Sequence, residues 1–257
     1  MTKLSSISNL PAVVAMIACA GLAACGNTDP AMAGSAGSPG VGGSGGSAGG
    51  AGGSGMGDPS QLLPLKTGNW WTYLVTDENQ VPTPKTQTVM EEGPVGGTGP
   101  NAAVTAFRMV TRKGVNGMDE TISWQARVGT RVVRYREQAY MANPPHALEL
   151  EEYWNPYKLR VDESPTHMTA GASWVETDQE TKLPVGGSPL MAAVEDRWTV
   201  SAERLAVTVQ GRSYEVLILT KTGAASQKTY WWARGIGKVK EIGVNQVEEL
   251  VSYQVAP

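Results

Sequence analysis

The stretch KTYWWARGIGKVKEIG, residues 228–243, has the pattern of a β-hairpin. Side chains alternate between the two faces of a strand, so Tyr230 and Trp232 should share one face and Trp231 should point to the other. The glycines within residues 234–237 interrupt the run, because glycine supplies turn geometry at little steric cost. We therefore predict a strand, a glycine turn and a second strand.

The strand after the turn alternates in the same way, which puts Val239 on the face opposite Lys238 and Lys240. The stretch lacks the third glycine and the strand-to-helix context of a dinucleotide-binding loop. A structural hairpin is therefore the prediction. A ligand-binding face made from Trp231 or Trp232 is the alternative.

The rest of the carboxyl-terminal 200 residues has the same character. Runs rich in β-branched and aromatic residues recur at spacings too short for helical crossovers between parallel strands, so we expect antiparallel pairing. The predicted fold class is all-β, a single antiparallel curved sheet or half-barrel of about 10–12 strands, with a β-sandwich as the alternative. The expected strands are 69–76, 84–92, 102–112, 120–128, 130–140, 147–154, 157–163, 172–183, 195–209, 213–221, 228–233, 237–243 and 247–255.

Longer Gly/Pro segments separate some of these runs and should form loops, at residues 93–101, 141–147 and 184–189. One short helical turn is expected at residues 188–193, where Ser188 can cap a turn that begins with proline.

The amino terminus has the parts of an export signal. Lys3 is the first and only charge before Asp29, and an apolar run of about 15 residues follows it and ends in small residues. The ending Leu-Ala-Ala-Cys at residues 22–25 resembles a bacterial lipobox. That resemblance implies a signal peptide over residues 1–24 and acylation of Cys25. Because glycine follows the cysteine, it also implies anchoring at the outer membrane, on its periplasmic face or at the cell surface.

The next segment should be a tether. Thirteen of the 27 residues from 31 to 57 are glycine and none is charged, so the segment cannot bury enough apolar surface to fold. We assign residues 25–57 to an acylated cysteine with a disordered Gly/Ser/Ala tether, and residues 58–257 to one antiparallel β domain. Beyond residue 25 the chain has no cysteine, which excludes a disulfide framework or a cysteine metal site in that domain.

Both ends of the domain carry a recurring pattern. It opens with Pro-Leu and Gly-Asn-Trp-Trp-Thr-Tyr within residues 64–73, and it closes with residues 231–240 and with Glu-Leu-Val-Ser-Tyr at residues 249–253. These motifs resemble a broad, largely uncharacterised group of bacterial exported domains, the TapB-like group. That group is similar to the curved β half-barrels of the lipoprotein-localisation (Lol) carriers, which bind acyl chains. The matched segments cover about a third of the domain, and residues 77–206 match nothing.

Taken together, these features lead us to expect a lipid-anchored envelope protein that is not an enzyme and that binds an apolar or lipid-like ligand in a curved sheet. The candidate ligand-binding residues are Trp231, Trp232, Tyr230 and Trp71. The alternatives are an envelope scaffold or protein-interaction module without a small ligand, and a carbohydrate-binding surface built on exposed tryptophans. A net charge of −3 argues against a nucleic-acid partner. We expect the membrane as a partner through Cys25, with an envelope protein as a further candidate.

Catalytic and metal-binding patterns are sparse in this sequence. His146 and His167 are the only histidines, and no nucleophile motif accompanies either. We therefore expect no catalytic residue, no metal site and no cofactor. An alternating row of carboxylates at residues 176–180 should form a solvated strand face, although calcium binding is the alternative reading. A cluster of arginines at residues 131–136 should pair with acidic strands rather than with anionic headgroups.

Overall fold

The structure is a computed structural model that describes residue 55, residues 57–224 and residues 226–257. The expected signal peptide, Cys25 and almost all of the expected tether lie outside these described residues. Gly57, the last residue of the expected tether, is buried, and its backbone N–H donates to the carbonyl of Gly235 at 2.9 Å.

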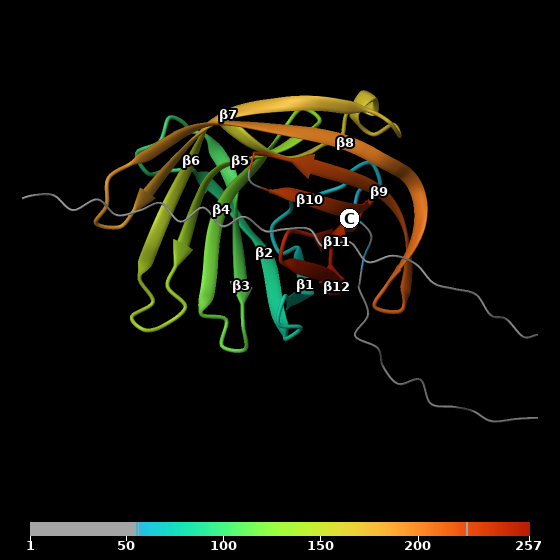
Figure 1. The fold of residues 1–257 in the computed structure, drawn as a ribbon, viewed down its shortest axis with the longest axis horizontal. Helices are drawn as coiled ribbons and strands as arrows, with labels where there is room; N and C mark the ends of the chain where they lie inside the picture. The colour runs from blue at the N-terminus through green and yellow to red at the C-terminus, as the bar shows by residue number, and fades with distance from the viewer. Residues whose placement is uncertain (1–54, 56, 225) are drawn as a thin grey trace, which may run out of the picture. The chain divides into compact units, whose positions relative to one another are not determined.

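Twelve strands form the described part of the chain, and a single 3-10 turn, η1 (Pro165–His167), is its helical element. Each strand pairs antiparallel with the next along the chain, and β1 also pairs with β12, which closes the sheet into a barrel (Figure 1). The strands are β1 Trp70–Asp77, β2 Pro82–Pro94, β3 Thr105–Lys113, β4 Asp119–Val128, β5 Arg131–Tyr140, β6 Leu148–Asp162, β7 Ser173–Pro184, β8 Leu190–Val209, β9 Arg212–Thr222, β10 Gln227–Ala233, β11 Gly237–Ile242 and β12 Gln246–Gln254.

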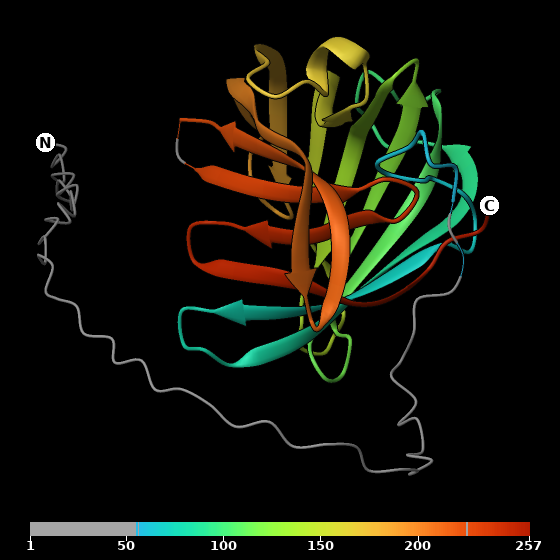
Figure 2. The same cartoon turned by 90° about the vertical axis from the view of Figure 1, so that its right-hand side faces the viewer.

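The predicted all-β antiparallel sheet is confirmed, and the sheet curves until it closes. The β-sandwich alternative is wrong, because one continuous sheet runs from β1 through β12 and back to β1. Closure removes the unpaired edges that an open sheet would leave. Figure 2 shows β3–β6 on one side of the barrel and β9–β12 on the other.

Two local predictions need correction. The helical turn expected at residues 188–193 is absent, because β8 begins at Leu190 and pairs with β7 from its first residue. Hydrogen bonds to a neighbouring strand override the weak local signal of a serine cap and a proline. The strands expected at 147–154 and 157–163 are one long strand, β6.

The glycine turn of the opening stretch forms as predicted between β10 and β11. Gly237 has a φ of +122°, and a Cβ atom there would lie 2.7 Å from Nε1 of Trp71. The indole N–H of Trp71 donates to the carbonyl of Ile236 at 2.5 Å. The glycine thus lets the turn approach a buried tryptophan of β1.

The two ends of the barrel differ. In an antiparallel meander, alternate connections lie at opposite ends. We call the end with the β4–β5, β6–β7, β8–β9 and β10–β11 connections the strap end, because residues 57–65 pack there. We call the end with the β1–β2, β3–β4, β9–β10 and β11–β12 connections the cavity end.

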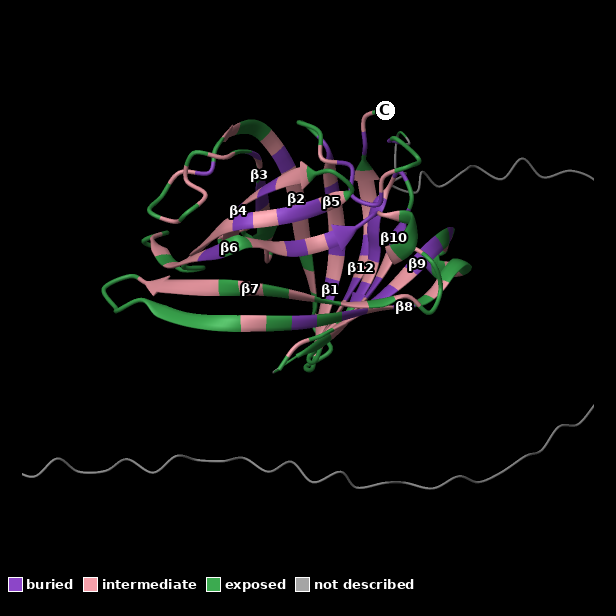
Figure 3. Cartoon of the chain, turned by 90° about the horizontal axis from the view of Figure 1, so that it is seen from above, coloured by how far each residue is buried: buried purple, intermediate pink, exposed green. Residues whose placement is uncertain are grey.

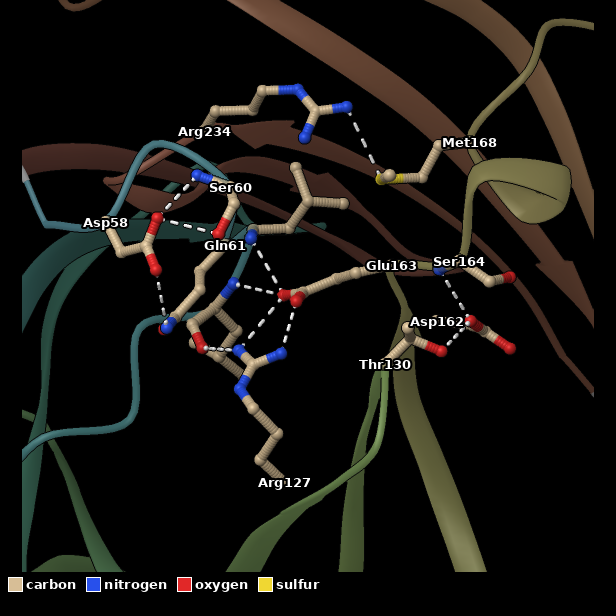
Figure 4. Close-up of polar contacts among 12 residues, drawn as sticks. Asp58, Ser60, Gln61, Arg127, Thr130, Asp162, Glu163, Ser164, Met168 and Arg234 are labelled. Carbon is tan, nitrogen blue, oxygen red and sulfur yellow. Dashed lines mark hydrogen bonds and ion pairs between the residues drawn. The ribbon is translucent and has the colours of Figure 1, made fainter.

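Residues 57–65, which we call the strap, are fixed to the barrel by polar contacts (Figure 4). The backbone N–H groups of Leu62 and Leu63 donate to Oε1 of Glu163 at 2.8 and 3.1 Å. Arg127 forms an ion pair with Glu163 and donates to the carbonyl of Leu63 at 3.0 Å. The Leu62 side chain is fully buried in the core, so the strap contributes apolar as well as polar contacts.

The apolar core fills much of the barrel interior. Strand alternation turns Trp71, Tyr73 and Val75 of β1 inward, and each is no more than 2% exposed. Figure 3 shows buried residues along most strands of the barrel, whereas β7 has none and the first part of β8 is exposed.

Candidate functional site

The cavity end of the barrel contains a cavity of about 220 Å³ with a strongly polar lining. Eight strands contribute side chains to it, from β2 through β6 and from β10 through β12. Its lining residues are Lys85, Gln87, Thr111, Thr121, Arg134, Glu137, Arg160, Lys228, Tyr230, Lys238, Glu241, Gln246 and Glu248. We refer to it as the charged cavity.

A β-bulge decides which lysine enters this cavity. In the pairing of β10 with β11, Trp231 lies opposite Lys240 but Trp232 lies opposite Lys238, so the register shifts by one residue. The prediction that Lys238 and Lys240 share a face is therefore wrong. Lys238 is 4% exposed inside the barrel, whereas Lys240 is half-buried and pairs with Glu249 at 2.7 Å. A bulge re-aims side chains in this way because one extra residue reverses the alternation.

Five charged side chains form an alternating chain along the cavity wall. Lys238 contacts Glu241 and lies 2.7 Å from Glu248. Lys228 extends the chain from Glu241 at 3.0 Å, and Lys85 extends it from Glu248 at 2.6 Å. The chain joins β2, β10, β11 and β12, and it holds three cations and two carboxylates.

For Glu241, Lys238 and Glu248, the attraction between opposite charges outweighs the free-energy cost of burying them. Burial lowers the pKa of Lys238, but Glu241 and Glu248 overcome that effect and raise it above its usual range. Burial likewise raises the pKa values of Glu241 and Glu248, yet Lys238 overcomes it and both carboxyl pKa values fall below normal. At the outer end, burial and the nearby Lys238 lower the pKa of Lys85 to about 8.

Two arginines lie on the opposite wall of the charged cavity. Arg134 of β5 forms an ion pair with Glu137. Burial lowers the pKa of Arg134, and the neighbouring Arg160 lowers it further against the opposing effect of Glu137. The Nε atoms of both guanidinium groups are buried and have no hydrogen-bond partner among the described residues.

The cavity therefore has an excess of positive charge. Its lining contains five cations and three carboxylates, a difference of +2. Each carboxylate already has a partner, since Glu137 pairs with Arg134 and the other two belong to the alternating chain. Arg160 has no ion pair with any residue that the structure describes. This excess is notable in a chain whose net charge is −3.

The predicted ligand-binding residues occupy three different environments. Trp71 and Trp232 lie in the apolar core at 1% and 2% exposure. Tyr230 is buried and reaches the wall of the charged cavity. Trp231 points to the other face, where Lys240 lies 5.9 Å from its ring. The alternation predicted for these aromatic residues is confirmed, and their role in ligand binding stays a prediction.

Aromatic rings also form a row through the interior beside the cavity. Trp174 stacks on Trp198 with ring centroids 6.2 Å apart, and Trp198 stacks on Tyr230 at 6.0 Å. The row continues to Trp232 at one end and to His167 at the other. Because Trp198 and Trp232 are buried, this row packs the barrel rather than offering an exposed sugar-binding surface.

The two histidines lie outside the charged cavity. His146 stacks on Tyr140 and lies 3.6 Å from Glu120. His167 stacks on Trp174, and its Nδ1 atom is 2.9 Å from Asp162. No serine hydroxyl hydrogen-bonds to either ring among the residues described.

The arginine cluster of β5 pairs with carboxylates, as predicted. Arg131 lies 3.0 Å from Asp162 and 3.2 Å from Glu176, and Arg136 pairs with Glu151. Within the described ranges, no group of three or more His, Cys, Asp or Glu side chains is arranged to hold a metal ion. The described chain also has no helix long and apolar enough to span a membrane.

The acidic row of β7 is only partly solvated, which corrects the expectation of a fully solvated face. Its members are half-buried on the inner face and interact with basic side chains, for example Glu180 with Lys158 at 3.3 Å. Burial and the carboxylates of Asp196 and Glu180 raise the pKa of Asp178 to about 6.

Sequence reasoning missed the charged cavity. The three charged residues at its centre come from two short segments, Lys-Val-Lys-Glu at residues 238–241 and Val-Glu-Glu at 247–249, which the sequence pattern predicts as ordinary strands. A signal was present in principle, because adjacent antiparallel strands with opposite charges often pair across the sheet. Strand alternation alone could not show that Lys238, Glu241 and Glu248 face inward.

The comparisons with known proteins assign no family to this chain. No protein-family model matches the chain, and no curated protein matches it. The chain is similar to a solved structure from Bacteroides fragilis, described as a candidate exported protein with a YmcC-like fold. The two are 10% identical, with a TM-score of 0.44, over 74% of this chain and 97% of that one. We draw nothing about function from a likeness of this strength.

Proposed function

We propose that this protein is a lipid-anchored cell-envelope protein whose barrel binds a small polar ligand without transforming it chemically. The charged cavity is the observation that carries the binding part of this proposal. Buried charges cost free energy, and replacing them with well-packed apolar side chains often stabilises a protein. Most of the buried core of the same barrel is apolar, so a cluster of charges kept at the cavity end suggests a function.

A polar ligand fits this geometry better than the apolar or lipid-like one expected from the resemblance to acyl-chain carriers. The apolar interior is occupied by its own side chains, such as Leu62, Trp71 and Leu250, which are no more than 1% exposed. The charged cavity has almost no apolar lining and would leave an acyl chain against lysines and carboxylates. An apolar ligand therefore stays a prediction of lower rank.

The anchoring part of the proposal rests on the signal and lipobox pattern of residues 1–25, which lies outside the described residues. An acylated Cys25 would hold the barrel at the outer membrane, because several acyl chains together bind a bilayer stably. Labelling cells with radioactive palmitate tests this directly. The wild-type chain should take up label and sediment with membranes, and Cys25→Ser should do neither. An unlabelled wild-type chain would refute the anchoring.

Native mass spectrometry tests ligand binding. The full chain is produced in bacteria, extracted from membranes in a non-ionic detergent and released from micelles in the gas phase. We expect a small added mass that disappears on denaturation and belongs to a polar molecule. An acyl lipid as the retained molecule would instead restore the apolar-ligand hypothesis.

A matched pair of variants on β3 locates the bound molecule. Thr111 lines the charged cavity, whereas Thr105 on the same strand is exposed. Thr111→Phe should fill the cavity and abolish the added mass, and Thr105→Phe should leave it unchanged. Retention of the molecule by Thr111→Phe would place the ligand elsewhere.

An envelope scaffold without a small ligand is the second candidate, and the filled apolar core favours it. A bare polypeptide mass under all conditions, with no uptake of added small molecules, would put this candidate first.

A further inference from the structure

We propose that the ligand of the charged cavity is a small anion, bound by the guanidinium group of Arg160 with help from Arg134. This inference rests on the binding function proposed above and names its chemical class. The anionic group would be a phosphate or a carboxylate, since both match the planar fork of a guanidinium group.

The first support is the charge balance of the cavity wall. All three lining carboxylates are used by lysines or by Arg134, and Arg160 has no carboxylate partner among the described residues. An ordered water molecule could accept a hydrogen bond from Arg160, but it could not neutralise the charge. A bound anion does both.

The second support is the position of the two arginines relative to each other. They are close enough that Arg160 helps to lower the pKa of Arg134, which shows mutual repulsion in a buried setting. The Nε–H of each is buried without an acceptor. Leaving such donors unsatisfied is costly, and two like charges facing one polar cavity are stabilised by an anion between them.

The third support is size. A cavity of about 220 Å³ has room for roughly seven water molecules at ~30 Å³ each. It therefore accommodates one phosphate ion or a short dicarboxylate. A bulkier anion would extend beyond the cavity into solvent.

Isothermal titration calorimetry on the full chain in non-ionic detergent tests the inference. Inorganic phosphate, succinate and glucose serve as the probes, in a low-salt buffer at pH 7. We expect phosphate or succinate to bind and glucose not to bind. The anion that binds more tightly shows whether the natural ligand carries a phosphate or a carboxylate group. Arg160→Gln should weaken that binding by about 10-fold or more, because a charge-assisted bidentate pair is lost.

Two further variants separate binding from folding. Arg108 is exposed on β3, so Arg108→Gln serves as the control and should bind like the wild type. Arg160→Lys keeps the charge but loses the planar fork, so its affinity should fall between those of Arg160→Gln and the wild type. Thermal unfolding without anion should show Arg160→Gln at least as stable as the wild type, because a half-buried charge without an ion-pair partner is gone. Weaker binding together with unchanged or greater stability cannot come from a damaged fold.

The outcomes are distinct. Equal anion affinities of the wild type and Arg160→Gln would overturn the assignment of Arg160. Glucose binding without anion binding, or a retained neutral molecule sensitive to Thr111→Phe, would overturn the anionic class and leave the binding function intact. Absence of any ligand in both calorimetry and native mass spectrometry would overturn both proposals.

Discussion

Replacing Lys238 with methionine should destabilise the barrel strongly. Lys238 is 4% exposed and is the central cation between Glu241 and Glu248, whose side chains are 5% and 2% exposed. Removing one partner of a buried ion pair typically costs about 3–5 kcal/mol. Each carboxylate keeps one outer lysine, so we expect about 3 kcal/mol, the lower end of that range.

Urea denaturation of the full chain at pH 7, followed by tryptophan fluorescence, measures this loss. The matched control is Lys240→Met on the same strand. Lys240 and Glu249 are 27% and 28% exposed on the other face of the sheet. Surface pairs of this kind contribute about 0–1 kcal/mol. A similar loss of unfolding free energy in both variants would refute the conclusion that Lys238 is the centre of a row of buried ion pairs.

A double variant and a pH series sharpen the same test. Lys238→Met combined with Glu241→Gln should recover part of the stability, because it removes one of the two carboxylates that have lost their shared lysine. The pKa of Glu248 is lowered in the folded state, so its ionised form stabilises the fold above its usual pKa of 4.5, and that stability is lost as the pH falls below it. The gap between wild type and Lys238→Met should therefore narrow below pH 4.5. A gap that is constant from pH 7 to pH 3 would contradict an electrostatic origin.

Three further predictions concern other parts of the barrel. Glu163→Gln should speed hydrogen exchange of the two strap amides about 10-fold, since it weakens a charge-assisted contact; unchanged protection would mean that apolar contacts alone hold the strap. Asp178→Asn should raise the free energy of unfolding near pH 8 and not near pH 3, because a carboxyl pKa raised to about 6 makes the ionised form destabilising only at higher pH; an equal effect at both pH values would exclude that cause. Gly237→Ala should cost about 1–3 kcal/mol in urea denaturation through the clash with Trp71 and a positive φ. Gly129→Ala, also at positive φ but in open space, should cost less, and equal losses would exclude the clash.

The strands and their order were predictable because their signals are local. Alternation over a few residues is enough to place Tyr230 and Trp232 on one face, and the structure confirms it. Short turns between consecutive runs imply antiparallel neighbours, which is how all twelve strands pair. The helical turn at residues 188–193 failed because its local signal was weaker than a ladder of hydrogen bonds to β7.

The candidate site was not predictable in the same way. Alternation put Lys238 and Lys240 together, and a one-residue shift in the pairing of β10 with β11 separated them. Arg160 and Lys85 lie far apart in the sequence and come from different strands. They line one cavity only because the intervening strands bring them around the same barrel.

The sequence alone thus determined the class of fold, the approximate strands and the hairpin at residues 228–243. Each follows from the preferences of neighbouring residues for one backbone conformation and one face. The tertiary structure decided the closure of β12 on β1, the bulge that turns Lys238 inward and the excess of positive charge in one end of the barrel. These depend on register and closure, which sum many weak contacts between residues far apart in the chain, and no local pattern records that sum.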